Sequence, residues 1–279
     1  MNTAYTSTEP LAPSPRPEGV LGEAMNTAYT STELLAYVAA GTLEDNKSVF
    51  VGTGLPMIAA MLAQRTHAPN LLIIFEAGGI GPQVPVLPIS VGDSRTFYRA
   101  VAASSMHDVM SASQAGYLDY GFLGAAQIDP YGNLNTTVIG EWRHPQVRLP
   151  GSGGANDVGS LCWRTIIVMR QDRRRFVDRL DFLTTPGYLD GPGARERAGL
   201  PAGSGPYRVI TQLGVYGFDE QSRRMRLLAT HPGVTVDDIQ ANSSFDLVIP
   251  DDVGTTEPPP PQVRRMMRDI DPTGMVIGK

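Results

Sequence analysis

The sequence predicts an α/β protein built on one open, mostly parallel sheet with helices on both faces. The main observation is Leu71–Phe75, five apolar residues in a row, which is typical of a strand buried on both faces of a parallel sheet. A second strand at 48–51 leads through a glycine turn into the apolar helical stretch 57–63, so residues 48–76 form a strand–helix–strand unit. Strands and helices alternate through most of 34–241, and no linker divides this body in two.

The remaining elements follow from apolar periodicity and from the positions of glycine and proline. Pro and Gly predict a loop at 82–94 and a long loop at 184–205, where the charged residues Arg195–Arg197 can pair with one another. Further helices are predicted from Ser31 onward and at 105–115, 235–241 and 262–269, and further strands at 120–129, 134–139, 165–169, 207–211, 214–218 and 223–228.

The N-terminal segment contains a direct repeat, because Met1–Glu9 recurs unchanged as Met25–Glu33. The residues between the two copies are rich in proline, which favours an unstructured linker. We interpret residues 1–33 as a disordered or extended N-terminal arm and 34–279 as a single domain. We interpret the first copy as an extension ahead of the real start at Met25, with no role in the fold, and the alternative is a genuine N-terminal arm.

Composition excludes several classes of function. The chain of 279 residues has a formal net charge of −5, which argues against nucleic acid binding, since that needs a basic face. Its one cysteine, Cys162, excludes an internal disulfide framework and fits a reducing cytosol, so we expect a cytoplasmic protein. No apolar run approaches the ~20 residues of a membrane helix, and the first residues lack the pattern of a signal peptide. The cysteine and histidine spacing matches no zinc site.

The central predicted strand ends in a carboxylate, Glu76. Residues 78–82, three glycines and a proline among them, then turn the chain sharply away. Open α/β sheets bind their ligands at the carboxyl ends of the strands, so an acid at this point is a candidate functional group. The structural alternative is a solvated acid at a strand end, or one that pairs with an arginine.

Two glycine-rich segments are candidate anion sites. Gly52–Gly54 lies between a strand and a helix, where loop amides and the helix N-terminus favour an anion, although a tight turn needs glycine in any case. Gly151–Gly154 contains three glycines with only a serine among them, and such a run can present successive N–H groups to an anion or a developing oxyanion. The alternative for this second segment is a plain flexible loop.

Six segments in this order resemble the β subunits of the family I CoA-transferases, the glutaconate CoA-transferase type in particular. Each segment alone is weakly specific, whereas the ordered set is specific and the resemblance extends from about Glu33 to Pro272. The segments are Gly52–Pro56, Glu76–Gly78, Gly124–Asn133, Gly151–Asn156, Thr185–Gly187 and Asp190–Gly193.

The resemblance implies a CoA-transferase-like fold and a ping-pong transfer of CoA from an acyl-CoA to a carboxylic acid. In that family a glutamate attacks the thioester and becomes a glutamyl-CoA thioester, and Glu76 aligns with this nucleophile. Ala77 stands where the family usually has serine. The resemblance also implies a partner α subunit, in an α2β2 heterotetramer, no metal and no permanently bound cofactor; CoA is the co-substrate and part of the covalent intermediate.

The same resemblance implies roles for the glycine segments. Backbone N–H groups of Gly153, Gly154 and Ala155 are expected to bind the oxyanion or CoA, and Gly52 and Gly54 are candidate CoA contacts. Two other functions stay open at this point. One is a CoA-thioester hydrolase or C–C-cleaving lyase on the same scaffold, and the other is a non-catalytic CoA-binding module.

Retention of a glutamate at position 76 argues against the first of these, because relatives that act as decarboxylases or ring-opening hydrolases replace it. The histidines do not form a dyad pattern with the motifs, so we expect structural or surface roles for them, and Cys162 is expected to be a core residue. These histidines are His67, His107, His144 and His231.

Overall fold

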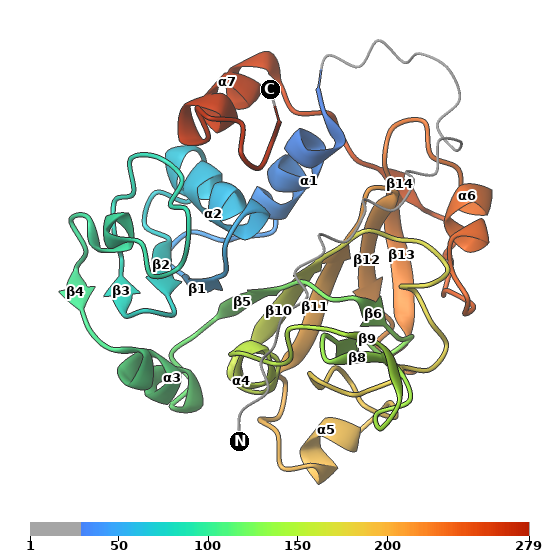
Figure 1. Cartoon of the computed structure of the whole chain (residues 1–279). Coiled ribbons are helices and arrows are strands. Elements are labelled where there is room, and N and C mark those ends of the chain that lie inside the picture. The colour runs from blue at the N-terminus through green and yellow to red at the C-terminus, as the bar shows by residue number, and fades with distance from the viewer. Residues whose placement is uncertain (1–28, 279) are drawn as a thin grey trace, which may run out of the picture.

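A ten-stranded sheet forms the centre of the protein in the computed structural model, which describes residues 29–278 (Figure 1). Its strand order is β14-β13-β12-β11-β10-β5-β1-β2-β3-β4. The run β2-β1-β5-β10-β11 is parallel, with antiparallel strands on both sides of it, so the predicted open and mostly parallel sheet is confirmed. The strands are β1 Ser48–Val51, β2 Leu72–Phe75, β3 Gly79–Ile80, β4 Ala102–Ala103, β5 Tyr120–Leu123, β10 Arg164–Val168, β11 Gly205–Ile210, β12 Gly214–Phe218, β13 Met225–Thr230 and β14 Gly254–Thr255.

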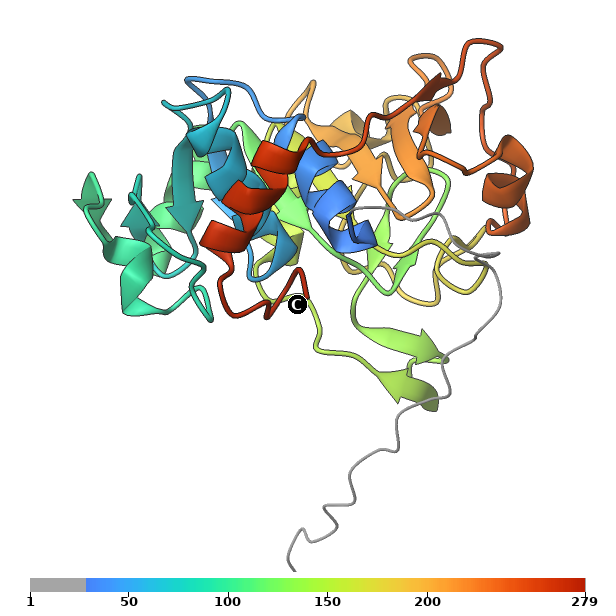
Figure 2. The ribbon, with the colours of Figure 1, turned by 90° about the horizontal axis from the view of Figure 1, so that it is seen from above.

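Helices cover both faces of this sheet, as predicted (Figures 1 and 2). Alternate residues of β2 enter two different cores: Ile73 and Phe75 belong to the core under α1, α2 and α7, and Ile74 belongs to the core on the α3 and α4 side. Burial of both strand faces explains the continuous apolar run. The helices are α1 Ser31–Ala40, α2 Leu55–Arg65, α3 Met106–Gln114, α4 Ala155–Leu161 and α7 Pro261–Ile270.

Smaller elements lie in the connections between the main strands. Some of the expected elements divide: the strand expected at 120–129 ends at Leu123, and the one expected at 134–139 is split between β7 and β8. Strands of two residues are not predictable from the sequence, because so short a stretch carries no periodicity. The smaller elements are β6 Gln127–Ile128, β7 Leu134–Asn135, β8 Val138–Gly140, β9 Pro145–Arg148, the 3-10 helix Ser94–Phe97, α5 Ala194–Arg197 and α6 Val236–Ala241.

The first helix begins inside the segment expected to be an arm. Thr30 caps α1, and Thr30 and Glu33 form a reciprocal capping box between their side chains and backbone N–H groups. Glu33 is buried, and its carboxylate oxygen Oε1 lies 3.4 Å from Nε of Arg268 in α7, with which it forms an ion pair. The expected boundary between residues 33 and 34 therefore falls within α1, and residues 29–33 belong to the folded body. The rest of the expected arm, 1–28, lies outside the described residues.

Across residues 29–278, every helix is too short or too polar to cross a membrane.

Candidate active site

Glu76 lies at the carboxyl edge of the parallel strands, directly after β2, and its side chain is half-buried. The turn that follows is tightly constrained. The Gly78 N–H donates to the Phe75 carbonyl at 2.9 Å, and Gly78 has a φ of +112°. A Cβ at Gly78 would lie 2.1 Å from the Ser104 carbonyl oxygen, so no other residue fits there. The glycines after Glu76 thus hold this carboxylate at the sheet edge.

Gly154 lies against the Glu76 carboxylate. A Cβ built on Gly154 would be 2.9 Å from Glu76 Oε1 and 3.0 Å from the Met110 methyl carbon. The φ of Gly154 is −79°, a value that any residue can adopt, so the backbone angle does not require glycine here. The close approach of the Glu76 carboxylate does, because it leaves no room for a side chain. The structure therefore brings together the acid and the glycine loop, two candidate features that lie far apart in the sequence.

The glycine loop presents two backbone amides that have no partner among residues 29–278. The Ala155 N–H donates to the Ser152 carbonyl at 2.9 Å, so this amide, expected to bind the oxyanion or CoA, is already engaged within the loop. The N–H groups of Gly153 and Gly154 make no hydrogen bond with any residue from 29 to 278. Two of the three expected donors are therefore without a partner among residues 29–278, and one of the two, Gly154, lies beside Glu76.

Gly52 shares the edge with Glu76, because Val51 and Phe75 are paired in register and each is followed by one of these two residues. A Cβ on Gly52 would meet no atom within 4 Å, so packing does not require glycine there. Gly54 is different: its φ is +80° at the N-cap of α2, and the turn itself explains it. Of the two candidate CoA contacts, Gly52 is the one that local structure leaves unexplained.

The glycine loop is fastened on both sides. Thr136 and Gly151 exchange two hydrogen bonds of 2.8 Å, one from the Thr136 hydroxyl to the Gly151 carbonyl and one from the Gly151 N–H to the Thr136 carbonyl. At the other end the Asn156 amide donates to the Thr184 carbonyl at 3.0 Å. These contacts hold Gly153 and Gly154 in place.

Hydrogen bonds of Asn133 join three of the motif segments to one another. Its amide oxygen accepts N–H groups of Gly187 at 2.7 Å and Leu189 at 3.0 Å, and its amide nitrogen donates to Asp129 at 2.7 Å. Burial raises the pKa of Asp129 to about 6, although the Asn133 donors favour its charged form. These motif residues thus build the scaffold, and within the described chain none of them forms a hydrogen bond with Glu76.

Arg195 is a supporting residue that the sequence does not reveal. Its side chain is buried, and its guanidinium donates to the carbonyls of Gly187 at 2.8 Å and Gly159 at 3.1 Å and to the Ser204 hydroxyl at 2.9 Å. The expected pairing with its charged neighbours is therefore wrong. Burial lowers the pKa of Arg195. Its partners come from three separate segments, and no local pattern in the sequence could indicate them.

Two residues expected to be structural, His231 and Cys162, are buried. His231 is buried and contacts the Thr211 carbonyl and the Thr256 hydroxyl, and burial lowers its pKa, which fits a structural role. Cys162 is fully buried, as expected for a core residue, and this burial raises the pKa of its thiol to about 12. Among residues 29–278 no group of three or more His, Cys, Asp or Glu side chains could hold a metal ion.

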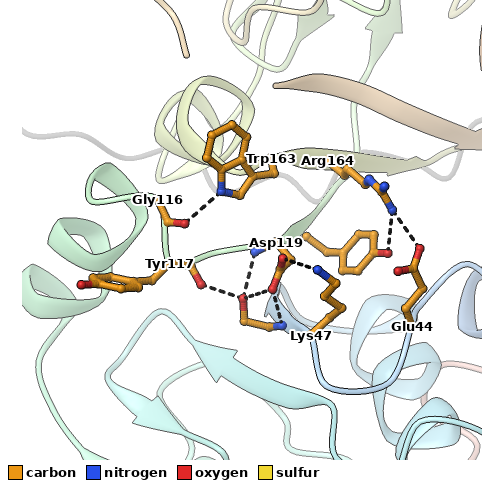
Figure 3. Close-up of polar contacts among 9 residues, drawn as sticks. Glu44, Lys47, Gly116, Tyr117, Asp119, Trp163 and Arg164 are labelled. Carbon is orange, nitrogen blue, oxygen red and sulfur yellow. Dashed lines mark hydrogen bonds and ion pairs between the residues drawn. The ribbon is translucent and has the colours of Figure 1, made fainter. Parts of the chain in front are cut away.

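A cavity of about 360 Å³ lies at the opposite, amino edge of the strands, among residues whose polar contacts are drawn in Figure 3. Its charged groups are paired: Arg164 with Glu44 at 2.8 Å, and Lys47 with Asp119 at 3.1 Å. The Trp163 indole N–H is likewise engaged, with the Gly116 carbonyl. We therefore interpret this cavity as structural. Its lining residues are Lys47, Asp119, Tyr120, Trp163, Arg164 and Gly203.

Comparison with known proteins gives consistent matches over most of the chain. The family model described as coenzyme A transferase matches residues 32–242. The B subunit of glutaconate CoA-transferase from Acidaminococcus fermentans is 39% identical, over 85% of this chain and 91% of that protein. The crystal structure of that transferase superposes with a TM-score of 0.85, covering 91% of this chain and 99% of the other.

Two further relatives differ in the activity that they are named for. The B subunit of 3-oxoadipate CoA-transferase from Pseudomonas knackmussii is 38% identical over 81% of this chain and 87% of that protein. The cholesterol ring-cleaving hydrolase IpdB subunit of Rhodococcus jostii is 30% identical over 79% of this chain and 83% of that protein.

Proposed function

This chain belongs to the coenzyme A transferase family, and on that basis we propose that it is the β subunit of an enzyme that moves CoA from an acyl-CoA to a carboxylic acid. The observation that carries the proposal is the contact between the Glu76 carboxylate and Gly154 at the carboxyl edge of the sheet. Similarity to subunits of two CoA-transferases supports the same reaction. The acids concerned are of the glutaconate or 3-oxoacid type.

The proposed chemistry starts with attack of Glu76 on the thioester carbonyl carbon. The Glu76 carboxylate makes no hydrogen bond or ion pair with any of residues 29–278, so no internal partner has to be displaced first. The tetrahedral intermediate bears an oxyanion, and its proposed donors are the N–H groups of Gly153 and Gly154, which have no partner in the described part of the chain. Collapse of the intermediate breaks the C–S bond and gives an acyl–glutamyl anhydride and a CoA thiolate.

The thiolate then attacks the Glu76 carbonyl carbon of the anhydride. This step releases the first carboxylate and leaves CoA on Glu76 as a thioester. A second carboxylate repeats the two steps in reverse and leaves as the new acyl-CoA, so Glu76 is regenerated. Gly52, with open space beside its Cα, is the place at this edge where the CoA chain can approach the backbone closely.

We propose that the active enzyme also contains an α subunit, in an α2β2 assembly. Both transferase relatives are named as B subunits, and the chain covers 91% of the first and 87% of the second. Glu76 is only half-buried in this chain, so its exposed side is open to residues of a partner. Such a partner would close the site and exclude water from the thioester.

A second function on the same scaffold, thioester hydrolysis or C–C cleavage, is favoured by the similarity to the IpdB hydrolase subunit. A glutamyl-CoA thioester can also be cleaved by water, so Glu76 does not decide between the two by itself. An assay of CoA release with and without an acceptor acid such as acetate separates them. A transferase consumes acyl-CoA in proportion to the acceptor, whereas a hydrolase does not need one. A non-catalytic CoA-binding module would consume none under either condition.

Trapping of the covalent intermediate tests the proposal directly. The complex with its partner subunit is incubated with an acyl-CoA labelled in the CoA part, without an acceptor. Label is expected on the peptide that contains Glu76, and borohydride reduction of the thioester should then inactivate the enzyme irreversibly. The peptide that contains Glu44 is the internal control and should carry no label. Failure to find CoA on the Glu76 peptide would mean that this glutamate is not the nucleophile.

A further inference from the structure

The methyl end of Met110 and the carboxylate of Glu76 both lie against Gly154. A Cβ on Gly154 would lie 2.9 Å from the carboxylate oxygen of Glu76 and 3.0 Å from the methyl carbon of Met110, so the ends of both side chains face the same point. Met110 is half-buried and packs in part against the core on the α3 and α4 side. Its methyl end is therefore at the site, while the rest of the residue belongs to the fold.

Helix α3, which carries Met110, is fastened to the turn that follows the proposed nucleophile. The Ser104 N–H donates to the Gly78 carbonyl at 2.9 Å, and Ser105 then caps the helix through its hydroxyl. The neighbour of Met110, Val109, is 1% exposed and anchors the helix in the core. The position of Met110 relative to that turn is thus set by hydrogen bonds at the helix start and by packing along its length.

The geometry of the proposed reaction places the acyl group next to Met110. A carbonyl carbon attacked by Glu76 has to approach its carboxylate oxygen to about 3–3.5 Å. The first carbons of the acyl chain then lie beside the carboxylate, where Gly154 contributes no side chain and Met110 contributes an apolar one. A thioether with three rotatable bonds is suited to forming a wall against alkyl groups of moderate size.

We propose that Met110 is a specificity-determining residue, which limits the size of the acyl group by closing an apolar pocket beside Glu76. This inference rests on the proposed transferase function. The ligand class is an acyl-CoA whose first carbon beyond the thioester carbonyl is a CH or CH2 group, as it is in both glutaconyl and 3-oxoacyl groups. Shortening Met110 should admit longer chains, and restoring its volume should exclude them again.

The test compares CoA transfer from hexanoyl-CoA and from acetyl-CoA by the complete complex. For Met110→Ala, the ratio of kcat/KM for hexanoyl over acetyl donors should rise about tenfold, the effect of a methylene or more in an apolar pocket. Met110→Leu should return the ratio to within about twofold of the parent, because its volume is similar. The matched control is Met106→Ala on the same helix, since Met106 is 54% exposed and the ratio should not change.

A ratio of two donors in one preparation does not depend on how much of the variant is folded. If the parent transfers CoA and Met110→Ala leaves the ratio within about twofold, the inference about Met110 is wrong and the proposed function is unaffected. If Met106→Ala shifts the ratio as much as Met110→Ala, the cause is a general change in helix α3 and not the loss of the Met110 side chain, and the inference is also wrong. If the parent transfers CoA from none of hexanoyl-, acetyl-, glutaconyl- and 3-oxoacyl-CoA, the proposed function fails and the inference fails with it. If it transfers CoA from glutaconyl-CoA but not from hexanoyl-CoA, Met110→Ala has to admit hexanoyl-CoA, or the inference is wrong.

Discussion

Two glutamates at opposite edges of the same parallel strands have very different surroundings. Glu44 precedes β1 at the amino edge, where its carboxylate accepts from the Arg164 guanidinium at 2.8 Å (Figure 3). The Tyr120 hydroxyl lowers the pKa of Glu44, burial opposes this, and Arg164 adds to the lowering. Glu76 follows β2 at the carboxyl edge, pairs with no group from residues 29–278 and lies against Gly154.

The two edges differ in the use of their polar groups, which pair with one another at the amino edge and lack such partners at the carboxyl edge within residues 29–278. At the amino edge Asp119 accepts from Lys47 and from the Ser48 N–H, so the pairs fix β1 and β5 relative to each other. At the carboxyl edge a carboxylate and two backbone amides lie close together without partners among residues 29–278. Open α/β sheets bind their ligands at this edge, so a carboxylate and amides without such partners there are positioned for chemistry. The amino edge also holds a cavity although its charged groups are paired, so the presence of a cavity is a poor guide to function here.

The largest effect is expected for Glu76→Gln. The substitution keeps the shape of the side chain and removes the nucleophile, so the transfer rate should fall at least ~10³-fold, since each tenfold is ~1.4 kcal/mol of barrier. The melting temperature should not change, because Glu76 makes no hydrogen bond or ion pair with residues 29–278. Steady-state kinetics of the complex and thermal melting of both proteins measure the two quantities.

Glu76→Asp tests the same position in a second way. It keeps the charge and withdraws it by one methylene, and a misplacement of about 1 Å can cost ~10²-fold in rate. If the Gln variant keeps near-parental turnover, Glu76 is not the nucleophile. It would then be an ordinary acid at a strand end, and the two edges of the sheet would not differ in function.

Part of this site could be predicted from the sequence because the signals are local. The apolar run that ends in Glu76, and the glycines at 151–154, each stand out within a few residues, and their order along the chain carries the family resemblance. What brings them together is a contact between residues 76 and 154, which no periodicity encodes. The same holds for Met110, which follows an amphipathic pattern typical of any surface helix.

Other features depend on which partner a group finds after folding. In the sequence Ala155 is equivalent to Gly153 and Gly154, but in the structure its amide is used by the Ser152 carbonyl. The repeat, read as one unit, places the start of the folded body after residue 33. In the structure the end of its second copy forms the capping box of α1. The helix predicted from Ser31 is confirmed, so it is the domain boundary taken from the repeat, and not the helix start, that the structure changes.

The next effect in size is expected for Gly154→Ala. Its Cβ would come within 2.9 Å of the Glu76 oxygen, so the carboxylate has to move, and kcat should fall ~10²-fold. The backbone angle of Gly154 suits alanine, so the melting temperature should change by only a few degrees. Gly92→Ala is the matched control, because the nearest atom to its Cβ would be the Ser90 hydroxyl at 3.9 Å. An active Gly154→Ala enzyme would show that the carboxylate does not work from this position.

The smallest effect is expected for Glu44→Gln, which tests the other side of the comparison. The Glu44 and Arg164 side chains are 52% and 44% exposed, so solvent screens their pair and its loss should cost ~0–1 kcal/mol of unfolding free energy. Because folding lowers the pKa of Glu44 from 4.5, the stabilisation is present above that pH and is lost as the pH falls through the folded pKa. The difference in melting temperature between parent and variant should therefore be found near neutral pH, shrink below about pH 4.5, and also shrink in about 1 M salt.

The transfer rate of Glu44→Gln should equal that of the parent, because this carboxylate is on the far edge of the sheet and is paired with Arg164. A tenfold loss of rate with an unchanged melting temperature would place the amino edge in the catalytic machinery, and pairing of a carboxylate would then no longer distinguish structural from chemical roles in this protein.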